Sequence, residues 1–320
     1  MGGRGGELPD VVTIREVGPR DGFQNEPETI PTKRKVELID ALARTGCKRL
    51  EVTSFVRADV IPQLADAAEV LARIDVPEDV AVSVLIPNER GLENALALLD
   101  AGRAAGEGNG RQAFDEINVF LSASEAHNRK NVNRSVEESL AGLEVVLTRA
   151  REAGLRCEGV ISTSFGCPYE GHVAPERVLE IARRLHAAGA QEIGFGDTTG
   201  MANPRQVGEL FTLWRDELQE AQLTAHFHNT RGQGLANVLA ALQAGVDSFE
   251  SSFGELGGCP VPAGATGNIA TEDLVSMLEE MEIATGIDLD ALLACAARVR
   301  EILGRPLGSH TLVAGPVDWG

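Results

Sequence analysis

Two histidines one residue apart are the strongest chemical feature of the sequence. His226 and His228 flank Phe227 in a run of strand-forming residues, and they are two of only six histidines in the chain. On a β-strand, alternate side chains point to the same side, so both imidazoles can reach one cation. Two buried structural histidines are the alternative interpretation. The pattern therefore offers two nitrogen ligands for a metal site that needs further ligands to be complete.

Oxygen ligands for the same cation are available from two other segments. Asp21 follows the first expected strand, and Asn268 follows a glycine-rich stretch at residues 254–267. A set of imidazole, carboxylate and amide ligands without a thiolate favours Mg²⁺ or Mn²⁺, although Zn²⁺ and Co²⁺ also accept such ligands. We expect Asp21, His226, His228 and Asn268 to bind one divalent metal.

Other charged side chains also lie at the ends of expected strands. Arg20 precedes Asp21, Glu51 lies in the second strand, and Asp197 ends the sixth. Surface charge at a frayed strand end is the alternative interpretation of each residue. Charges at several strand ends are nevertheless what an active site at the mouth of a barrel requires.

Two loop residues could join the same chemistry. Cys259 lies in a segment too rich in glycine to be helical, so its thiol could exchange a proton once the loop closes. Taken alone, a cysteine is more often a small buried apolar residue. Tyr169 is the only tyrosine and follows the fifth strand, where it either closes over a substrate or anchors its own loop.

Regular elements must position these residues, and the hydrophobic pattern alternates between strand and helix periods. Short apolar or β-branched runs are separated by helix-length segments with apolar residues three and four positions apart. Eight such units without a compositional break favour one closed (β/α)₈ TIM barrel over two doubly wound halves. The expected strands are residues 11–17, 49–53, 80–86, 116–121, 156–163, 192–196, 223–228 and 248–252.

We expect a single catalytic TIM-barrel domain over residues 1–320. The barrel covers about residues 11–268, a C-terminal helical extension covers about 269–303, and the glycine- and proline-rich residues 304–320 are expected to be irregular. Several glycines follow helical segments and suit left-handed C-terminal caps. These are Gly46, Gly102, Gly154, Gly189 and Gly245.

The composition excludes several classes of partner. The chain has 29 Lys and Arg against 48 Asp and Glu, a formal charge of −19, and no basic cluster, which argues against nucleic-acid and membrane-surface binding. Five cysteines without a Cys-x-x-Cys pair indicate reduced thiols rather than a disulfide framework. Neither a signal peptide nor a membrane-spanning run is recognisable, so we expect a cytoplasmic protein.

Eight collinear segments resemble the 3-hydroxy-3-methylglutaryl-CoA (HMG-CoA) lyase family, which comprises metal-dependent TIM-barrel lyases related to isopropylmalate and homocitrate synthases. They include Arg-Glu-x-x-x-Arg-Asp at residues 15–21, Gly-Asp-Thr-Thr-Gly at 196–200, His-Phe-His at 226–228 and Gly-Gly-Cys-Pro at 257–260. The common order of these segments over about residues 11–290 is more specific than any single motif.

The resemblance implies a divalent-metal-dependent carbon–carbon lyase that cleaves HMG-CoA, or a close analogue, to acetyl-CoA and a keto acid, as in leucine degradation. It implies that Arg20 stabilises the developing enolate oxygen, that Cys259 takes part in proton transfer, and that Glu51 and Asp197 orient their neighbours. The initial base is His226 or a metal-bound group. The expected substrate contacts are Gln24, Tyr169, Thr198 and Arg231.

One departure from the family pattern keeps alternatives open. Lyases of this family usually continue the His-x-His motif with Asp-Thr and an aromatic residue, whereas this chain has Asn229, Thr230 and Arg231. The alternatives are a lyase for citramalyl-CoA or another branched 3-hydroxyacyl-CoA, and a condensing acyltransferase that uses acetyl-CoA and a 2-keto acid. A barrel that only binds a CoA ester is disfavoured by the intact set of reactive residues. We expect a CoA-ester substrate and a homodimer packed through the C-terminal helices.

Overall fold

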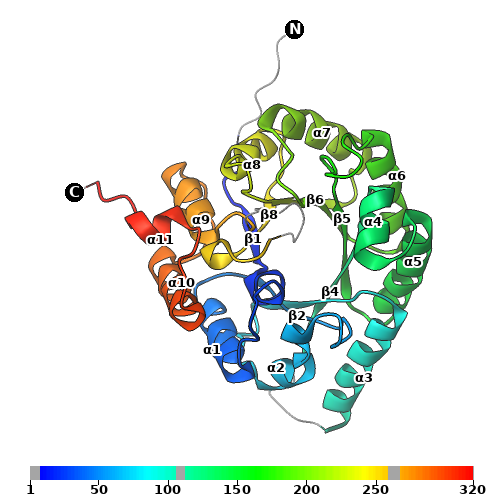
Figure 1. Ribbon diagram of the computed structural model, residues 1–320, viewed down its shortest axis with the longest axis horizontal. Coiled ribbons are helices and arrows are strands. Elements are labelled where there is room, and N and C mark those ends of the chain that lie inside the picture. Colours follow the sequence, from blue (N-terminus) through cyan, green and yellow to red (C-terminus); the bar gives the residue numbers. More distant parts are fainter. Residues whose placement is uncertain (1–7, 106–111, 259–266, 320) are drawn as a thin grey trace.

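Eight parallel strands close into a barrel in the computed structural model, which describes residues 8–105, 112–258 and 267–319. Each strand pairs with the next, and β8 pairs with β1 (Figure 1). The predicted (β/α)₈ barrel with additional C-terminal helices is thereby confirmed. The strands are β1 Thr13–Glu16, β2 Arg49–Ser54, β3 Ala81–Leu85, β4 Glu116–Ser122, β5 Arg156–Ser162, β6 Glu192–Asp197, β7 Gln222–Phe227 and β8 Ser248–Ser251.

Helices surround the barrel and connect successive parallel strands (Figure 1). Short π- or 3₁₀-helices lie at Gly18–Gly22, Pro62–Leu64 and Phe253–Glu255. The α-helices are α1 Thr32–Leu42, α2 Ala67–Arg73, α3 Glu89–Ala105, α4 Glu125–Val132, α5 Val136–Glu152, α6 Pro175–Ala188, α7 Pro204–Glu217, α8 Gly234–Gln243, α9 Thr271–Glu280, α10 Leu289–Leu303 and α11 His310–Ala314. Within the described residues, no helix is both long and apolar enough to cross a membrane.

The amino-terminal part of the barrel interior is filled by buried ion pairs rather than by apolar side chains. Arg15 contacts Glu158, Glu192 and Glu250, while Arg49 pairs with Glu192 at 2.6 Å. Buried charges are tolerated only when paired, and here each guanidinium bridges carboxylates from several strands. The network fills the amino-terminal end of the barrel, so a site inside the barrel can lie only at the carboxyl ends of the strands.

Glycine caps end several helices as predicted. Gly46, Gly154, Gly189 and Gly245 all have positive φ values, between 83° and 123°. The prediction for Gly102 is wrong, because α3 continues through it to Ala105. Ala101, Ala104 and Ala105 flank Gly102 and have high helix propensity, and a glycine within a helix costs only about 1 kcal/mol relative to alanine.

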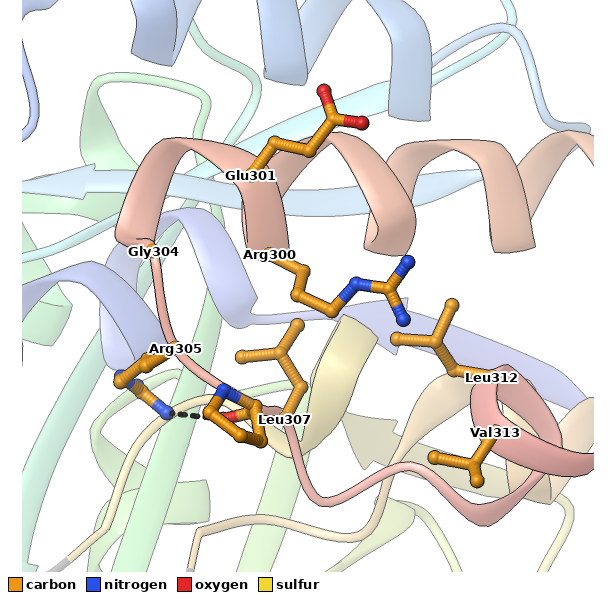
Figure 2. A pocket seen from close by; sticks show the side chains of 8 residues that line it. Arg300, Glu301, Gly304, Arg305, Leu307, Leu312 and Val313 are labelled. Atoms are coloured by element: carbon orange, nitrogen blue, oxygen red, sulfur yellow. Dashed lines mark hydrogen bonds between the residues drawn. The ribbon is translucent and has the colours of Figure 1, made fainter.

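The C-terminal region contains one helix that was not expected. α9 and α10 match the predicted extension, but α11 lies in the segment expected to be irregular. The carboxylate of Asp273 accepts hydrogen bonds from the backbone N–H groups of His310 and Thr311, at 3.0 and 2.7 Å. Because this partner lies on α9, the local sequence does not reveal it. A surface pocket between α10 and α11 is lined only by residues of the 300–313 segment and contains none of the predicted site residues (Figure 2).

Candidate functional site

Three predicted metal ligands converge at the carboxyl ends of the strands. Asp21 lies in the π-helix Gly18–Gly22 directly after β1, while His226 is on β7 and His228 follows it. One ligand atom from each of these side chains lies within 4.8 Å of the others. Asp21 and His228 are buried and His226 is half-buried. The expected side-chain parity of the His-x-His motif is therefore found in the structure.

The two imidazoles face each other through their Nε2 atoms, which lie 3.1 Å apart. The Nδ1 atom of His226 lies 2.9 Å from Oε2 of Glu250 on β8. A carboxylate in this position fixes the orientation and tautomer of a metal-binding imidazole. Sequence reasoning missed Glu250. The available signal was a lone carboxylate on a strand of otherwise small or apolar residues, Ser248–Ser251.

Asn268 completes the set of predicted ligands. It is buried, forms a β-bridge with His228, and donates from Nδ2 to Oδ2 of Asp21 at 2.8 Å. Its Oδ1 atom is buried without a hydrogen-bond partner. A side chain at Gly257, whose φ is +98°, would come within 2.6 Å of Asn268 and 3.1 Å of Asp21. The backbone at Gly257 can therefore approach the ligands only because it carries no side chain.

The protonation states of Asp21 and His228 suit a cation. Burial raises the pKa of Asp21, but Arg20 and His226 more than offset it and hold the pKa below its ordinary value. Burial, reinforced by the neighbouring His226, lowers the pKa of His228 to about 3. An ionised carboxylate, a neutral imidazole and an orphaned amide oxygen are the forms that divalent metals bind. The arrangement can hold a divalent metal.

Arg20 lies beside the ligand cluster and is fixed by two carboxylates. Its Nη1 atom donates to Oδ1 of Asp21 at 2.7 Å, and its Nη2 atom lies 2.7 Å from Oε2 of the fully buried Glu51. Burial alone would lower the pKa of Arg20, but these two carboxylates raise it above its ordinary value. The structure thus brings Arg20 and Glu51, predicted from separate strands, into one contact.

Asp197, Thr198 and Arg231 are arranged around the turn after β6. Asp197 accepts hydrogen bonds from the backbone of Met201 at 2.7 Å, and burial raises its pKa to about 6. Thr198 Oγ1 accepts from the backbone N–H of Thr163 at 3.0 Å. Arg231 donates from Nη1 to the carbonyl oxygens of residues 199 and 200, at 2.8 and 2.7 Å. Asp197 and Arg231 therefore order this turn.

Three predicted residues remain: Gln24, Tyr169 and Cys259. Gln24 donates from Nε2 to Oδ1 of Asp21 at 2.8 Å and so belongs to the metal-ligand cluster. Tyr169 lies on the loop after β5, with Lys130 Nζ 3.6 Å from the centre of its ring. Cys259 lies outside the described residues.

Comparison with known proteins assigns the family. Residues 11–299 match the model of the family described as HMGL-like. The chain belongs to the HMGL-like family. Over 304 residues it is 46% identical to hydroxymethylglutaryl-CoA lyase YngG of Bacillus subtilis, covering 95% of this chain and 97% of that protein. Over 309 residues it is 43% identical to the mitochondrial hydroxymethylglutaryl-CoA lyase of Rattus norvegicus, covering 97% and 91%.

Solved structures of this family share the fold. The Bacillus subtilis HMG-CoA lyase superposes with a TM-score of 0.90 at 45% identity, covering 96% of this chain and 99% of that one. An HMG-CoA lyase from Acinetobacter baumannii, solved with coenzyme A and 3-methylmalate, gives a TM-score of 0.88 at 39% identity and covers 96% of both chains. This member of the HMGL-like family is accordingly an enzyme of the lyase class.

One further polar pair near the mouth was not singled out from the sequence. Ser122, at the end of β4, has its Oγ atom 2.6 Å from Nδ1 of His127 on α4. Both side chains are buried, and burial lowers the pKa of His127. The pairing depends on the turn between β4 and α4, which the spacing of the two residues does not specify.

Proposed function

We propose that this HMGL-like enzyme cleaves 3-hydroxy-3-methylglutaryl-CoA, or a close analogue, to acetyl-CoA and the corresponding keto acid, acetoacetate for HMG-CoA. The observation that carries the proposal is the group of Asp21, His226 and His228 beside the fixed guanidinium of Arg20. The names of the relatives, which are lyases of this substrate at 43–46% identity, support it.

We further propose that Asp21, His226, His228 and Asn268 hold Mg²⁺ or Mn²⁺. A divalent cation held there would supply Lewis-acid polarisation of the substrate's hydroxyl and carboxylate oxygens and so would lower the pKa of the hydroxyl. Glu250 holds His226 in the orientation that its ligand role needs, at 2.9 Å. A proposed ligand set of oxygen and nitrogen donors that includes no thiolate favours these two metals over softer ones.

Arg20 is placed to stabilise the charge that bond cleavage produces. The C3 hydroxyl gives its proton to the initial base, for which His226 is the candidate on this chain, and becomes the carbonyl of the keto acid. The C2–C3 bond breaks at the same time, and its electron pair moves into the thioester to form the enolate of acetyl-CoA. A positively charged group that is already fixed in place stabilises such an oxyanion without reorganisation. Glu51 and Asp21 provide that fixation for Arg20. Protonation of the enolate at C2, assigned to Cys259, releases acetyl-CoA.

The substrate contacts complete the proposal. Gln24, beside Asp21, and Thr198, after β6, lie on loops at the carboxyl ends of the strands, as Tyr169 and Arg231 do. We propose that these four residues contact the acyl-CoA. The coenzyme A in the Acinetobacter baumannii relative supports a CoA ester as the substrate class.

Release of acetyl-CoA tests the function directly. Purified protein with Mg²⁺ or Mn²⁺ is incubated with HMG-CoA, citramalyl-CoA and other branched 3-hydroxyacyl-CoA esters, and free acetyl-CoA is measured. We expect release from HMG-CoA or a close analogue, abolished by a chelator. Consumption of acetyl-CoA with a 2-keto acid, and no release from any ester, would assign the protein to the condensing enzymes instead.

Two further properties stay predictions. A homodimer packed through the C-terminal helices is testable by light scattering of the purified chain. A cytoplasmic location is testable by cell fractionation, and the family alone does not decide it, because its rat relatives include proteins named cytoplasmic and mitochondrial.

A further inference from the structure

Solvent exposure of the strand residues marks where the barrel interior is open. All eight strands lie in the described part of the chain, and their residues are almost all buried. Apart from the first residue of a strand, four strand residues keep partial exposure. They are Phe120 on β4, Val160 and Ser162 on β5, and His226 on β7.

The exposed residues of β4 and β5 point into the barrel. Glu116 pairs with Arg49 inside the barrel at 2.9 Å, so Phe120, four residues later on the same strand, faces the same side. Glu158 contacts Arg15 inside the barrel, so Val160 and Ser162 face inward as well. Phe120 and Val160 are neighbours in the β4–β5 register. Their exposure therefore comes from an opening inside the barrel mouth.

A glycine on the next strand enlarges this opening. Gly196 lies on β6, and an added Cβ atom would make only ordinary contacts of 3.5–3.6 Å, with the nearest atoms in Ile161, Ser162 and Thr198. Its φ is not in the left-handed region, so neither packing nor backbone geometry excludes a side chain. The missing side chain leaves space beside Ser162. We call Phe120, Val160, Ser162 and Gly196 the β4–β6 patch.

The β4–β6 patch differs from the ligand cluster in charge. None of its four residues is charged, whereas the side of the mouth formed by β7, β8 and β1 carries Arg20, Asp21 and the two histidines, and His226 is next to Gly196 in the β6–β7 register. In the closed barrel, β4 and β5 lie across from β8 and β1, which lead to Asn268 and Asp21. We expect the carboxylate of the substrate, and the oxygens that become negatively charged during cleavage, to bind next to the cation and Arg20. The uncharged substituent on C3 is left for the β4–β6 patch.

We propose that the β4–β6 patch binds the substituent on C3 of the acyl-CoA and thereby decides which branched 3-hydroxyacyl-CoA is cleaved. This inference rests on the proposed lyase function. One methylene in an apolar pocket changes discrimination between substrates by about 10- to 200-fold. Phe120 and Gly196 set the size of the patch from opposite sides, so substitutions at the two positions must have opposite effects on selectivity.

The test compares three esters that differ only at C3: 3-hydroxyglutaryl-CoA, HMG-CoA and 3-ethyl-3-hydroxyglutaryl-CoA. We measure kcat/KM for each with the purified full-length chain and Mg²⁺. Phe120→Ala should raise the ratio of the ethyl to the methyl ester by at least about tenfold, because it removes part of the wall. Gly196→Ala should lower the same ratio by about tenfold, because it adds a methyl group to the pocket.

A matched control separates selectivity from stability. Val119 is on the outward face of β4 and fully buried, so Val119→Ala should lower stability and keep the wild-type ratio. Wild-type ratios in both patch variants would overturn the inference while leaving the lyase function intact. A wild-type protein that cleaves none of the three esters contradicts the proposed function itself. If Phe120→Ala does not fold, the Gly196→Ala ratio alone decides.

Discussion

The two imidazoles of the candidate metal site differ in how they are held. His226 is fixed by the carboxylate of Glu250 at 2.9 Å, whereas Nδ1 of His228 is buried without a hydrogen-bond partner. Burial lowers the pKa of His226, but Glu250 outweighs it and the net pKa is raised. The proposed ligand role of His226 therefore depends on Glu250, which we infer to be a positioning residue.

Replacement of Glu250 tests this dependence. Glu250→Gln keeps the shape of the side chain but removes its charge, so His226 loses its anionic partner. We expect Mn²⁺ affinity to fall by about 10- to 100-fold, as measured by isothermal titration calorimetry. The exposed Glu220→Gln serves as the control and should bind Mn²⁺ like the wild type. Unchanged affinity in Glu250→Gln would show that His226 needs no carboxylate.

Substitutions of His228 and Cys259 should distinguish metal binding from proton transfer. His228→Ala removes a ligand and should weaken Mn²⁺ binding together with turnover. Cys259→Ala should leave Mn²⁺ affinity unchanged and lower kcat by about 10²- to 10⁴-fold, because it removes only a proton-transfer group. Calorimetry and acetyl-CoA release on the same preparations distinguish the two outcomes. Normal turnover of Cys259→Ala would exclude the thiol from the mechanism.

The direction of a side chain was predictable from the sequence where it depends on a single strand. The common direction of His226 and His228 follows from the period of a single strand. The partner of His226 could not be predicted, because it depends on the β7–β8 register that sets His226 opposite Glu250. The contact between Arg20 and Glu51 likewise needs the closed barrel, although each residue was singled out separately.

At the scale of elements, glycines with positive φ values follow the ends of several helices. Gly46 ends the turn after α1 with a φ of +95°, and Gly154 does the same after α5 with a φ of +83°. Only one of them is crowded. A Cβ atom on Gly46 would lie 2.0 Å from the carbonyl oxygen of Gly286, whereas nothing lies within 4 Å of the same atom on Gly154.

The two glycines make a matched pair. Gly154→Ala should lower the free energy of unfolding by about 1–2 kcal/mol, the cost of a left-handed backbone for an L-residue. Gly46→Ala should lose about 1–3 kcal/mol beyond that, because the carbonyl of Gly286 must also move. Urea unfolding followed by circular dichroism measures both. Equal losses would mean that the Gly46–Gly286 approach relaxes at no cost.

Element boundaries were predictable where the local sequence contains the stop signal, and not elsewhere. The eight strands and the helices α9 and α10 follow from periodicity. The continuation of α3 through Gly102 and the formation of α11 do not, because the first needs the surrounding apolar residues and the second needs Asp273 from another helix. A tertiary partner thus decides the second of these.

At the scale of the whole molecule, part of the acidic surplus lies on outer helices. Glu137 and Glu138 on α5, and Glu279 and Glu280 on α9, are all exposed on outer helices. A net charge of −19 repels a CoA ester at long range. Attraction must therefore act locally, through a bound cation and Arg20.

Two acids behave differently from this surface charge, because they are buried between the barrel and the C-terminal helices. Glu16, at the end of β1, accepts hydrogen bonds from the backbone of Phe253 and from Thr271. Glu272 on α9 accepts from the backbone N–H of Gly254 at 2.9 Å. Burial raises the pKa of Glu16 to about 7 and that of Glu272 to about 8. Both acids connect the body of the barrel to its C-terminal extension.

These raised pKa values make global stability fall as the pH rises. The folded state keeps a proton on Glu272 up to about pH 8, while an exposed glutamate in the unfolded chain loses it near its ordinary pKa of 4.5. The folded state therefore binds more protons between these values, and the stabilisation is present below pH 4.5 and lost as the pH passes 8. Glu272→Gln cannot ionise, so its stability should fall less between pH 6 and pH 9 than that of the wild type, by on the order of 2 kcal/mol. Urea midpoints at the two pH values measure this difference, with the exposed Glu220→Gln as a control that should follow the wild type. Parallel pH dependences of Glu272→Gln and the wild type would show that Glu272 is already ionised in the folded enzyme at pH 6.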